Sequence, residues 1–445
     1  MNRRGRTLFG IDAGIAIGVI AVLAGSITLL ATAIVRPSGG LDQSFAHKQA
    51  IFAVIGFGMA FVVSRVPIGF WQRFWPHALV LSVAGVLLVK FLGTFVPAMA
   101  PIINGSRRWI NLPGPFDPQP SEFGKVLALV AIAGFLASRH REIRDGRVFA
   151  TGLAMMAVPA AVVFSQPDFG TAQVYGWLAL GALFFAGARW LHFAMLGGAV
   201  IAISVLVLGI FPAVTGQQLV HDYQIKRLTG FLDPEADPQG TNYQTIQAKV
   251  AIGSGGVAGR GDGQASQVQQ GFLPEPQTDF IFATLVERYG FLGGVLLLGT
   301  YGFLISRIFS MVASAATPFS RLIVGGVGVL LTSQVVINVG MVIGVLPITG
   351  VPLPMFSYGG SAIMTNMVAI GLVISALRES ETPNVRYQRR TGRPVGGYGS
   401  LRAQAGESTT AGAGRRRGAA QLVPFASPLV GGTAKRRRKR RPTGR

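Results

Sequence analysis

The sequence predicts an all-α membrane protein with about ten transmembrane helices and a large extracytoplasmic loop between the seventh and the eighth. Half of its 445 residues are hydrophobic and 13% are charged, whereas soluble domains carry roughly 25% charged residues. Runs of about 20 apolar residues, the length that a helix needs to cross a bilayer, recur along the chain. These runs are continuous rather than alternating, which favours helices over a transmembrane barrel.

Ten apolar stretches are expected to form these helices. The first follows the basic start "MNRRGR" and resembles a signal peptide. It is too long for one and more spans follow, so we expect an uncleaved first helix. The predicted spans cover about residues 11–35, 48–64, 77–97, 122–138, 148–165, 170–187, 190–214, 280–306, 321–346 and 360–377.

Arginine residues between the spans predict the orientation. Short connections such as "ASRHREIRDGR" and "SRIFSMVASAATPFSR" contain arginine, and basic connections stay on the cytoplasmic side. Both termini then lie in the cytoplasm, with residues 1–10 preceding a membrane domain of residues 11–377. The outer side receives about residues 98–121, the long segment of about residues 215–279, and "LPITGVPLPMFSYGG".

Most of the net charge of +22 lies in the tail, residues 378–445, which holds 17 Lys and Arg against three acids. The tail lacks the apolar periodicity of a folded core, which predicts a disordered cytoplasmic segment that contacts anionic lipid. Docking of a protein partner is the alternative, and specific nucleic-acid binding is not expected. The chain has no cysteine, which excludes thiol catalysis, disulfides and cysteine metal sites.

The long outer segment combines turns, a short helix and a carboxylate at the start of the next span. Two Asp-Pro steps in "FLDPEADPQG" predict turns, and "NYQTIQAKVAIGSGG" predicts a short amphipathic helix closed by glycines. The glycine-rich "GSGGVAGRGDG" lacks the spacing of a nucleotide-binding P-loop. Asp279 in "TDFIF" ends the segment, where it can cap the following helix, carry chemistry, or do both.

Several motifs stand in the order found in the SEDS family of shape, elongation, division and sporulation proteins. They are "GSRRWI", "QPSEFGK", "QPDFGTA", "FLDPEADPQG", "YQTIQAKVAIGSGG", "FLPEPQTDFIF" and "LPITGVPLPMFSYGGSA". The chain resembles this family over about residues 12–377, and the basic tail lies outside the resemblance. The stretches "AIGSGGVAGRG" and "INVGMVIGVLPITGVPLPMFSYGG" are more similar to the RodA branch than to the FtsW branch.

The resemblance implies a peptidoglycan glycosyltransferase of the bacterial cytoplasmic (inner) membrane. Such enzymes polymerise lipid II, a disaccharide-pentapeptide on undecaprenyl pyrophosphate, at the outer face, with inversion at the anomeric carbon. They work with a class B penicillin-binding protein and with the cell-shape or division machinery. The RodA branch implies a role in elongation and shape, and an FtsW-like role in division is the alternative. The family's catalytic acid carries over to Asp279.

The residue types on the outer side suit that chemistry. A sugar hydroxyl that attacks an anomeric carbon loses a proton, and a carboxylate within hydrogen-bonding distance accepts it as a general base. The leaving pyrophosphate gains negative charge, which Arg, Lys or a divalent cation stabilises. We expect Asp279 to be the base. The sequence shows no recognisable cluster of metal ligands, so a requirement for Mg²⁺ or Mn²⁺ is left open.

Seven further residues are candidates for substrate binding: Arg107, Arg108, Glu122, Lys125, Asp168, Lys249 and Ser357. Most also have a structural interpretation. Glu122 and Lys125 are three apart and can form an internal salt bridge, Asp168 stands at a helix start, which an acid stabilises, and the two arginines can be snorkelling anchors beside Trp109.

A rigid re-entrant turn is expected for "PITGVPLPMFSYGGS", with Ser357 and Ser361 as helix caps.

Two positions depart from the family pattern. Gln277 stands where many relatives have His, which puts a proton or metal role there in doubt. Relatives commonly carry two acids after the motif, whereas this chain has Glu287 and Arg288. A reversed charge near the cavity is expected to alter the choice of partner or ion.

Two other classes of function are compatible with ten spans. A transporter or flippase for lipid-linked precursors also places polar groups in the membrane, although the helices show no internal repeat. A non-enzymatic scaffold that recruits a penicillin-binding protein is the second. Formation of glycan polymer from lipid II separates the enzyme from both.

Overall fold

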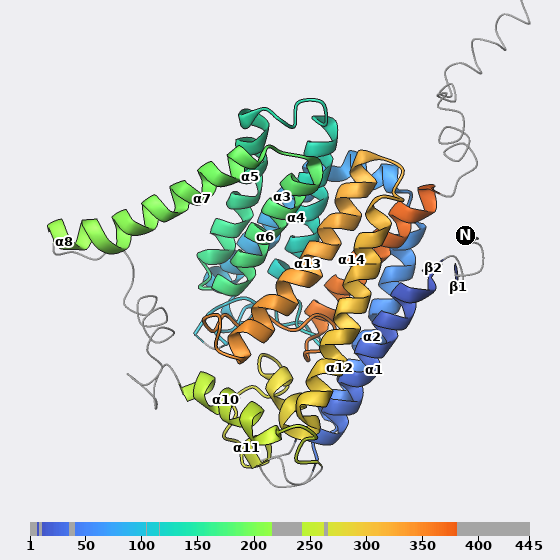
Figure 1. Ribbon diagram of the computed structural model, residues 1–445, viewed down its shortest axis with the longest axis vertical. Helices are drawn as coiled ribbons and strands as arrows, with labels where there is room; N and C mark the ends of the chain where they lie inside the picture. The colour runs from blue at the N-terminus through green and yellow to red at the C-terminus, as the bar shows by residue number, and fades with distance from the viewer. Residues whose placement is uncertain are drawn as a thin grey trace, which may run out of the picture. The chain divides into compact units, whose positions relative to one another are not determined.

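The computed structural model describes residues 7–8, 11–34, 41–103, 105–114, 116–215, 243–261 and 266–380. Within this part the chain is almost entirely helical, and ten helices are long and apolar enough to span a membrane (Figure 1). The two-residue strands β1 (Thr7–Leu8) and β2 (Ile11–Asp12) pair antiparallel before the first helix. The predicted all-helical, ten-span membrane protein is confirmed.

The helices lie close to the predicted spans. They are α1 (Ala13–Ala33), α2 (Ser44–Arg65), α3 (Ile68–Phe95), α4 (Pro120–Ser138), α5 (Gly146–Phe164), α6 (Phe169–Ala186), α7 (Trp190–Val205), α12 (Ile281–Val312), α13 (Pro318–Val342) and α14 (Gly360–Ser380). The largest difference is at α3, which begins at Ile68 rather than near residue 77 and continues through Pro76. Membrane helices tolerate an internal proline because neighbouring groups satisfy the freed carbonyl.

The segment between α7 and α12 is described in part. The π-helical turn η3 (Leu206–Ile210) and α8 (Phe211–Thr215) continue α7. The helix α10 (Tyr243–Gly255) confirms the short helix expected there, and α11 (Ser266–Gln269) follows it. The turns expected in "FLDPEADPQG" and the basic tail lie outside the described residues.

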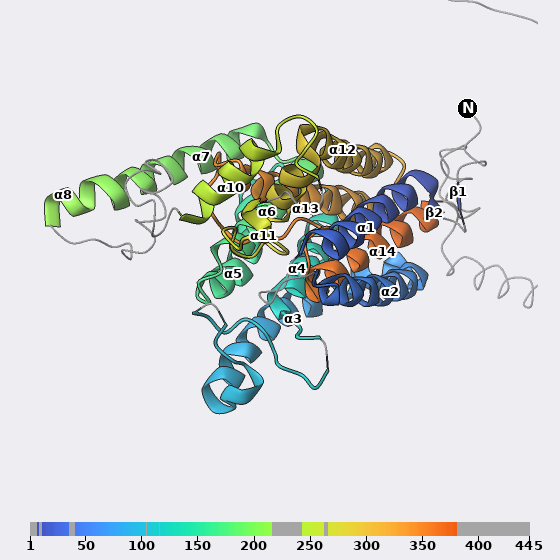
Figure 2. The ribbon, with the colours of Figure 1, turned by 90° about the horizontal axis from the view of Figure 1, so that it is seen from below.

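Helices α4, α13 and α14 form the centre of the bundle, because most of their residues are buried. Helices in a membrane approach one another closely where small residues face a neighbour. A Cβ atom on Gly326 of α13 would lie 2.2 Å from Leu129 Cδ1 of α4. In contrast, α7 with its continuation α8 extends away from the bundle (Figures 1 and 2), and its most apolar stretch has no buried residue.

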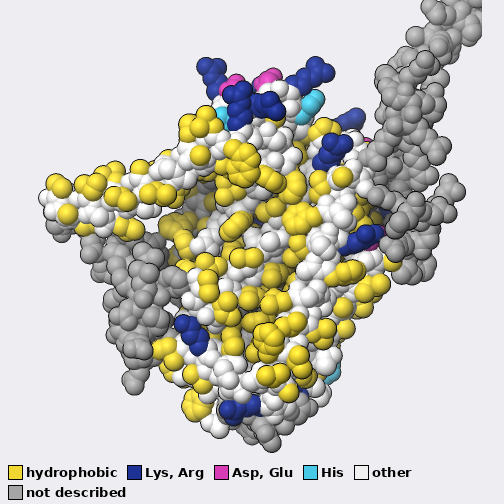
Figure 3. Space-filling view, in the orientation of Figure 1, with side chains coloured by type: hydrophobic (Ala, Val, Ile, Leu, Met, Phe, Trp, Pro, Cys, Tyr) yellow, Lys and Arg dark blue, Asp and Glu magenta, His cyan; other side chains and the backbone are white. Residues whose placement is uncertain are grey.

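The surface matches a protein that sits in a bilayer. On the face shown in Figure 3, hydrophobic side chains cover the flank and charged side chains gather at one end. That end carries the exposed connection between α4 and α5, including Arg139, Arg141 and Arg144, and is called the basic end below. The opposite end carries α10 and α11, with α10 lying against α12 and α13 (Figures 1 and 2), and is called the loop end.

Candidate active site

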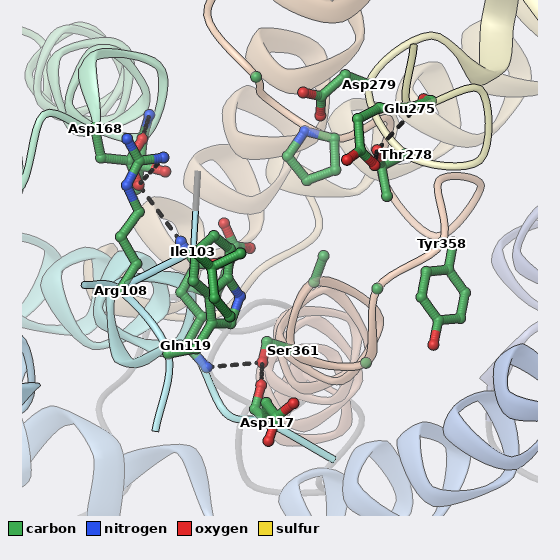
Figure 4. Close-up of a pocket in the computed structure, with 18 of the residues that line it drawn as sticks. Ile103, Arg108, Asp117, Gln119, Asp168, Glu275, Thr278, Asp279, Tyr358 and Ser361 are labelled. Atoms are coloured by element: carbon green, nitrogen blue, oxygen red, sulfur yellow. Dashed lines mark hydrogen bonds and ion pairs between the residues drawn. The ribbon is translucent and has the colours of Figure 1, made fainter. Parts of the chain in front are cut away.

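A cavity of about 400 Å³ opens at the loop end, where α4, α6, α12 and α14 begin (Figure 4). Its walls come from these first turns and from the segments between α3 and α4 and between α13 and α14. Five carboxylates and, among the described residues, one basic side chain line it: Asp117, Glu122, Asp168, Glu275, Asp279 and Arg108. The cavity is therefore strongly acidic, with one fixed positive charge at its wall.

Asp279 lies in this cavity, two residues before α12. The N-cap of α12 is Phe280, and no side chain caps the helix. Within the described part of the chain, no group donates a hydrogen bond to the Asp279 carboxylate, whose Oδ2 lies 3.3 Å from the place that a Cβ on Gly350 would take. The capping interpretation of Asp279 is wrong, since its carboxylate points into the cavity (Figure 4).

The backbone that carries Asp279 is held by hydrogen bonds to three consecutive carbonyl oxygens. The Tyr358 N–H donates to the Gln277 carbonyl at 2.9 Å, and the Ser357 Oγ donates to the Thr278 carbonyl at 2.7 Å. Asn338 Nδ2 donates both to the Asp279 carbonyl at 3.0 Å and to the Val351 carbonyl at 2.8 Å. None of these bonds involves the Asp279 carboxylate, so the main chain that presents it is held while the side chain is not.

Glu275 lies beside Asp279 in the same motif. Its carboxylate accepts hydrogen bonds from Thr278 Oγ1 and Gln277 Nε2, each at 3.1 Å. Its φ of 47° is unusual for a residue with a side chain, so this turn is imposed by its surroundings. Gln277, at the position where the family resemblance led us to expect His, is thus a neutral donor to Glu275. An amide does not titrate near neutral pH, so Gln277 is neither an acid nor a base.

The electrostatics of the cavity favour a proton acceptor. Burial, followed by the negative charges of Glu275 and Asp168, raises the pKa of Asp279 from 3.8 to about 6, while Arg108 acts in the opposite direction. A general base works best when its pKa lies near the operating pH. Asp279 is therefore ionised at neutral pH and still basic enough to accept a proton.

Arg108 and Asp168 form the wall that faces Asp279 (Figure 4). Arg108 donates to the carbonyls of Gln166 and Pro167, at 3.2 and 2.6 Å, and its Nη1 lies 3.9 Å from Asp168 Oδ2. Asp168 caps α6 by accepting from the Thr171 N–H at 3.0 Å. The backbone contacts hold the guanidinium at the cavity, where it can meet an anionic group.

Glu122 and Lys125 form a buried ion pair at the base of α4. Lys125 Nζ lies 2.7 Å from Glu122 Oε1, and the two side chains are 1% and 3% exposed. Glu122 lines the cavity, whereas Lys125 lies behind it. The second carboxylate oxygen, Oε2, is buried and has no hydrogen-bond partner among the described residues.

Besides Lys125, three more predicted site residues do not line the cavity. Arg107 Nη1 donates to the Ala100 carbonyl at 2.6 Å and its side chain packs on Gly93 of α3. Lys249 of α10 is exposed and lies against Gly344. Ser357 is buried; its Oγ accepts from the Leu353 N–H at 2.8 Å and donates to Thr278. It is not a helix cap, because its hydroxyl joins two loops.

Ser361 also differs from expectation. It stands inside the first turn of α14 and joins that helix to the segment before α4, accepting from the Gln119 N–H at 2.9 Å and donating to the Asp117 carbonyl at 3.3 Å. The expected helix cap is therefore wrong. Its hydroxyl closes the cavity wall between α4 and α14 (Figure 4).

The second family departure does not reach the cavity. Arg288 is buried and its Nη1 donates to the Thr32 carbonyl at the end of α1. Glu287, fully buried, accepts from the Gln267 and Val268 N–H groups at 2.8 and 3.3 Å and so anchors α11. A charge effect of Arg288 on the cavity is not supported, because the side chain contacts a different helix end.

Sequence reasoning missed several residues of this site, among them Asp117, Glu275 and Asn338. Glu275 stood inside the quoted motif but was not chosen, although an acid four residues before the proposed base is a signal. Asn338 lies in the apolar stretch of α13, and a fully buried amide in a membrane helix is itself a signal of a structural or functional contact.

The fold and the cavity together define a polytopic membrane protein with an acid-lined site at one face of the bilayer. The family described as "Cell cycle protein", FTSW_RODA_SPOVE, matches residues 11–382. The chain belongs to this family. It is 35% identical to the peptidoglycan glycosyltransferase MrdB of Escherichia coli K12 over 344 residues, covering 77% of this chain and 88% of that protein.

Other relatives agree with this assignment. Stage V sporulation protein E of Bacillus subtilis is 38% identical over 339 residues, covering 76% of this chain and 87% of that protein. Among solved structures, a chain of a peptidoglycan synthase complex matches with a TM-score of 0.66 and 29% identity, covering 84% of this chain and 99% of that one. The rod shape determining protein RodA of Thermus thermophilus matches with a TM-score of 0.57 and 25% identity, covering 84% and 98%.

Proposed function

We propose that this protein is a peptidoglycan glycosyltransferase that polymerises lipid II, with Asp279 as the general base. The observation that carries the proposal is the Asp279 carboxylate, which lies in the cavity without a hydrogen-bond donor among the described residues and has a raised pKa. The names of the relatives support the reaction class. We further propose that the basic end faces the cytoplasm, as the positive-inside rule favours, and that the cavity opens at the outer face of the inner membrane.

The reaction uses the residues around the cavity in distinct roles. The Asp279 carboxylate takes the proton of the attacking sugar hydroxyl, whose oxygen forms a bond to the anomeric carbon of the donor. The bond from that carbon to the pyrophosphate oxygen breaks, and inversion follows from attack on the opposite side. Arg108 is placed to balance the negative charge that develops on the pyrophosphate. Glu122 contributes a further carboxylate to the cavity wall, held by its ion pair with Lys125.

Whether Mg²⁺ or Mn²⁺ takes part is a separate question for the assay. Within the described residues, no group of three or more His, Asp or Glu side chains is arranged to hold a metal ion, so no step is assigned to Mg²⁺ or Mn²⁺. The assay below, run with and without a chelator, tests the requirement directly.

A crosslinking partner is part of the proposal. One structural neighbour belongs to a complex that coordinates peptidoglycan polymerization and crosslinking, which supports a class B penicillin-binding protein as partner here. The stretches similar to the RodA branch favour elongation over division. The basic tail is proposed to contact anionic lipid at the cytoplasmic surface.

The test is polymerisation of lipid II by the purified protein, with the partner present and transpeptidation blocked. The parent is expected to form glycan polymer. Asp279→Asn is expected to insert and melt like the parent and to polymerise roughly 10²–10⁴-fold more slowly, the usual contribution of a general base. Glu142→Gln, a change at an exposed acid of the basic end, is the matched control and should keep the parental rate.

The remaining outcomes decide between the other functions. Lipid translocation without polymer would identify a flippase, and neither activity in the presence of the partner would identify a scaffold. A folded Asp279→Asn variant that polymerises at the parental rate would exclude Asp279 as the base while leaving the glycosyltransferase in place.

A further inference from the structure

A second hollow lies on the flank of the bundle, between α1, α2 and α14. It has a volume of about 540 Å³, which is within the range of small-molecule sites. Its walls are almost entirely apolar along their length. They include Ile15, Val19 and Ile20 of α1, Phe57, Ala60 and Phe61 of α2, and Met367, Ile370 and Ile374 of α14. None of these residues lines the acidic cavity.

The groove has the length of one leaflet. On α14 it extends from Met367 to Arg378, which is about 16 Å of helix at 1.5 Å per residue. The hydrocarbon core of a bilayer is about 30 Å thick. The groove therefore covers the half of the membrane that adjoins the basic end, and it is open toward the lipid.

Two arginines stand together at the basic end of the groove. Arg65 closes α2, and its Cζ lies 4.6 Å from the centre of the Phe61 ring, which is part of the wall. Arg378 lies in the last turn of α14, and its Nη1 donates to the Ser64 carbonyl at 3.2 Å. Because Ser64 and Arg65 are adjacent, this bond brings the Arg378 guanidinium to the mouth that Arg65 also lines.

The described residues place no carboxylate against these two charges. Within the described residues, neither Arg65 nor Arg378 takes part in an ion pair. The neighbouring acid, Glu379, accepts a hydrogen bond from Ser320 Oγ of α13 at 3.1 Å, and Ser320 is not part of the groove. An apolar groove that ends in two like charges has the complementarity of an anionic amphiphile, and basic pockets between membrane helices on the cytoplasmic side bind such head groups.

We propose that this groove binds one anionic phospholipid from the leaflet at the basic end. One acyl chain lies between α1, α2 and α14, and the phosphate lies between Arg65 and Arg378, which both donate to its oxygens. A zwitterionic lipid of the same chain length fits the apolar wall but gains less from the two arginines. The site joins the ends of α2 and α14 to the first helix, so its lipid is a structural ligand of the bundle.

The test measures lipid retention by the purified full-length protein in native mass spectrometry. The probes are phosphatidylglycerol and phosphatidylcholine with the same acyl chains. The double variant Arg65→Ala with Arg378→Ala should bind phosphatidylglycerol about 30-fold more weakly, since each basic residue near the surface contributes about 1 kcal/mol. Its binding of phosphatidylcholine should change little. The matched control, Arg141→Ala with Arg144→Ala, removes the same charge from an exposed connection at the same end.

A second pair of variants tests the apolar part. Nothing lies within 4 Å of a Cβ added at Gly58 or at Gly302, so Gly58→Leu fills the groove without a clash and Gly302→Leu is its control on α12. Gly58→Leu should weaken the binding of both lipids, and Gly302→Leu should weaken the binding of neither.

An equal loss of phosphatidylglycerol binding in the two double-arginine variants would assign the binding to general surface charge. Unchanged lipid retention in Gly58→Leu, with weaker copurification of the penicillin-binding protein, would assign the groove to a partner helix. Either result overturns the proposal.

Discussion

Asp168 and Asp279 occupy similar positions in the sequence, but their carboxylates have different hydrogen-bond partners in the structure. Each stands at the loop end just before a membrane helix, and each lines the same cavity. The Asp168 carboxylate has several polar partners. It caps α6, accepts a hydrogen bond from Gln119 Nε2 at 3.4 Å and faces Arg108. The Asp279 carboxylate accepts no hydrogen bond from the described residues, while its own backbone carbonyl is held by Asn338.

The difference separates a structural acid from a reactive one. Hydrogen bonds to an ionised carboxylate lower its pKa and stabilise the fold, whereas burial without such bonds raises the pKa. Burial and the neighbouring acids therefore make the folded protein less stable when Asp279 is ionised, and they keep the Asp279 carboxylate basic. The restraint that Asp279 needs is supplied through the main chain, by groups that leave its carboxylate free.

The largest stability effect is expected at Asn338. Asn338→Leu leaves the buried carbonyls of Asp279 and Val351 without this donor, which should lower the free energy of unfolding by about 2–4 kcal/mol and slow polymerisation. Gln334→Leu, one turn earlier on α13, is the control: both polar atoms of its side-chain amide are buried without a partner among the described residues, so its removal should be neutral or stabilising. Thermal unfolding of the two variants measures the contrast. Equal losses would show that Asn338 does not hold the base.

A smaller effect is expected when each acid is shortened. Asp168→Ala removes the cap of α6 and should lower the free energy of unfolding by about 1 kcal/mol. Asp279→Ala should cost nothing or stabilise the protein at neutral pH, because it removes an ionised group that burial and Glu275 disfavour. The unfolding midpoints at pH 7.5 measure both. A larger loss at Asp279 than at Asp168 would reverse the assignment of the structural and the reactive acid.

The smallest effect is a shift in pH dependence. Polymerisation requires ionised Asp279, so the rate should fall as the pH drops through about 6. Glu275 raises the pKa of Asp279, and Glu275→Gln therefore should move this acidic limb to lower pH while the plateau persists. Rates measured between pH 5 and pH 8 for parent and variant test this. An acidic limb that stays in place would mean that a different group controls the profile.

Several site residues could be chosen from the sequence because their motifs are local. Arg108, Glu122, Asp168 and Asp279 all stand at or before a predicted span, and they line one cavity. Arg107 illustrates the limit: it adjoins Arg108, yet its side chain packs on α3 and bonds to Ala100. Neighbouring side chains in an irregular segment diverge, and no periodicity tells which one faces the cavity.

The sequence by itself determined that this chain is a bundle of about ten membrane helices with an acid at the start of α12. Apolar length and arginine position act over about 20 residues and need no distant contact. Only the tertiary structure decided that Asp279 does not cap α12. It also decided that Asn338, from another helix, holds the Asp279 backbone by a hydrogen bond. It also decided that Arg65 and Arg378, more than 300 residues apart, share the mouth of one groove. Such pairings depend on how helices pack, and packing is set by side chains distant in sequence.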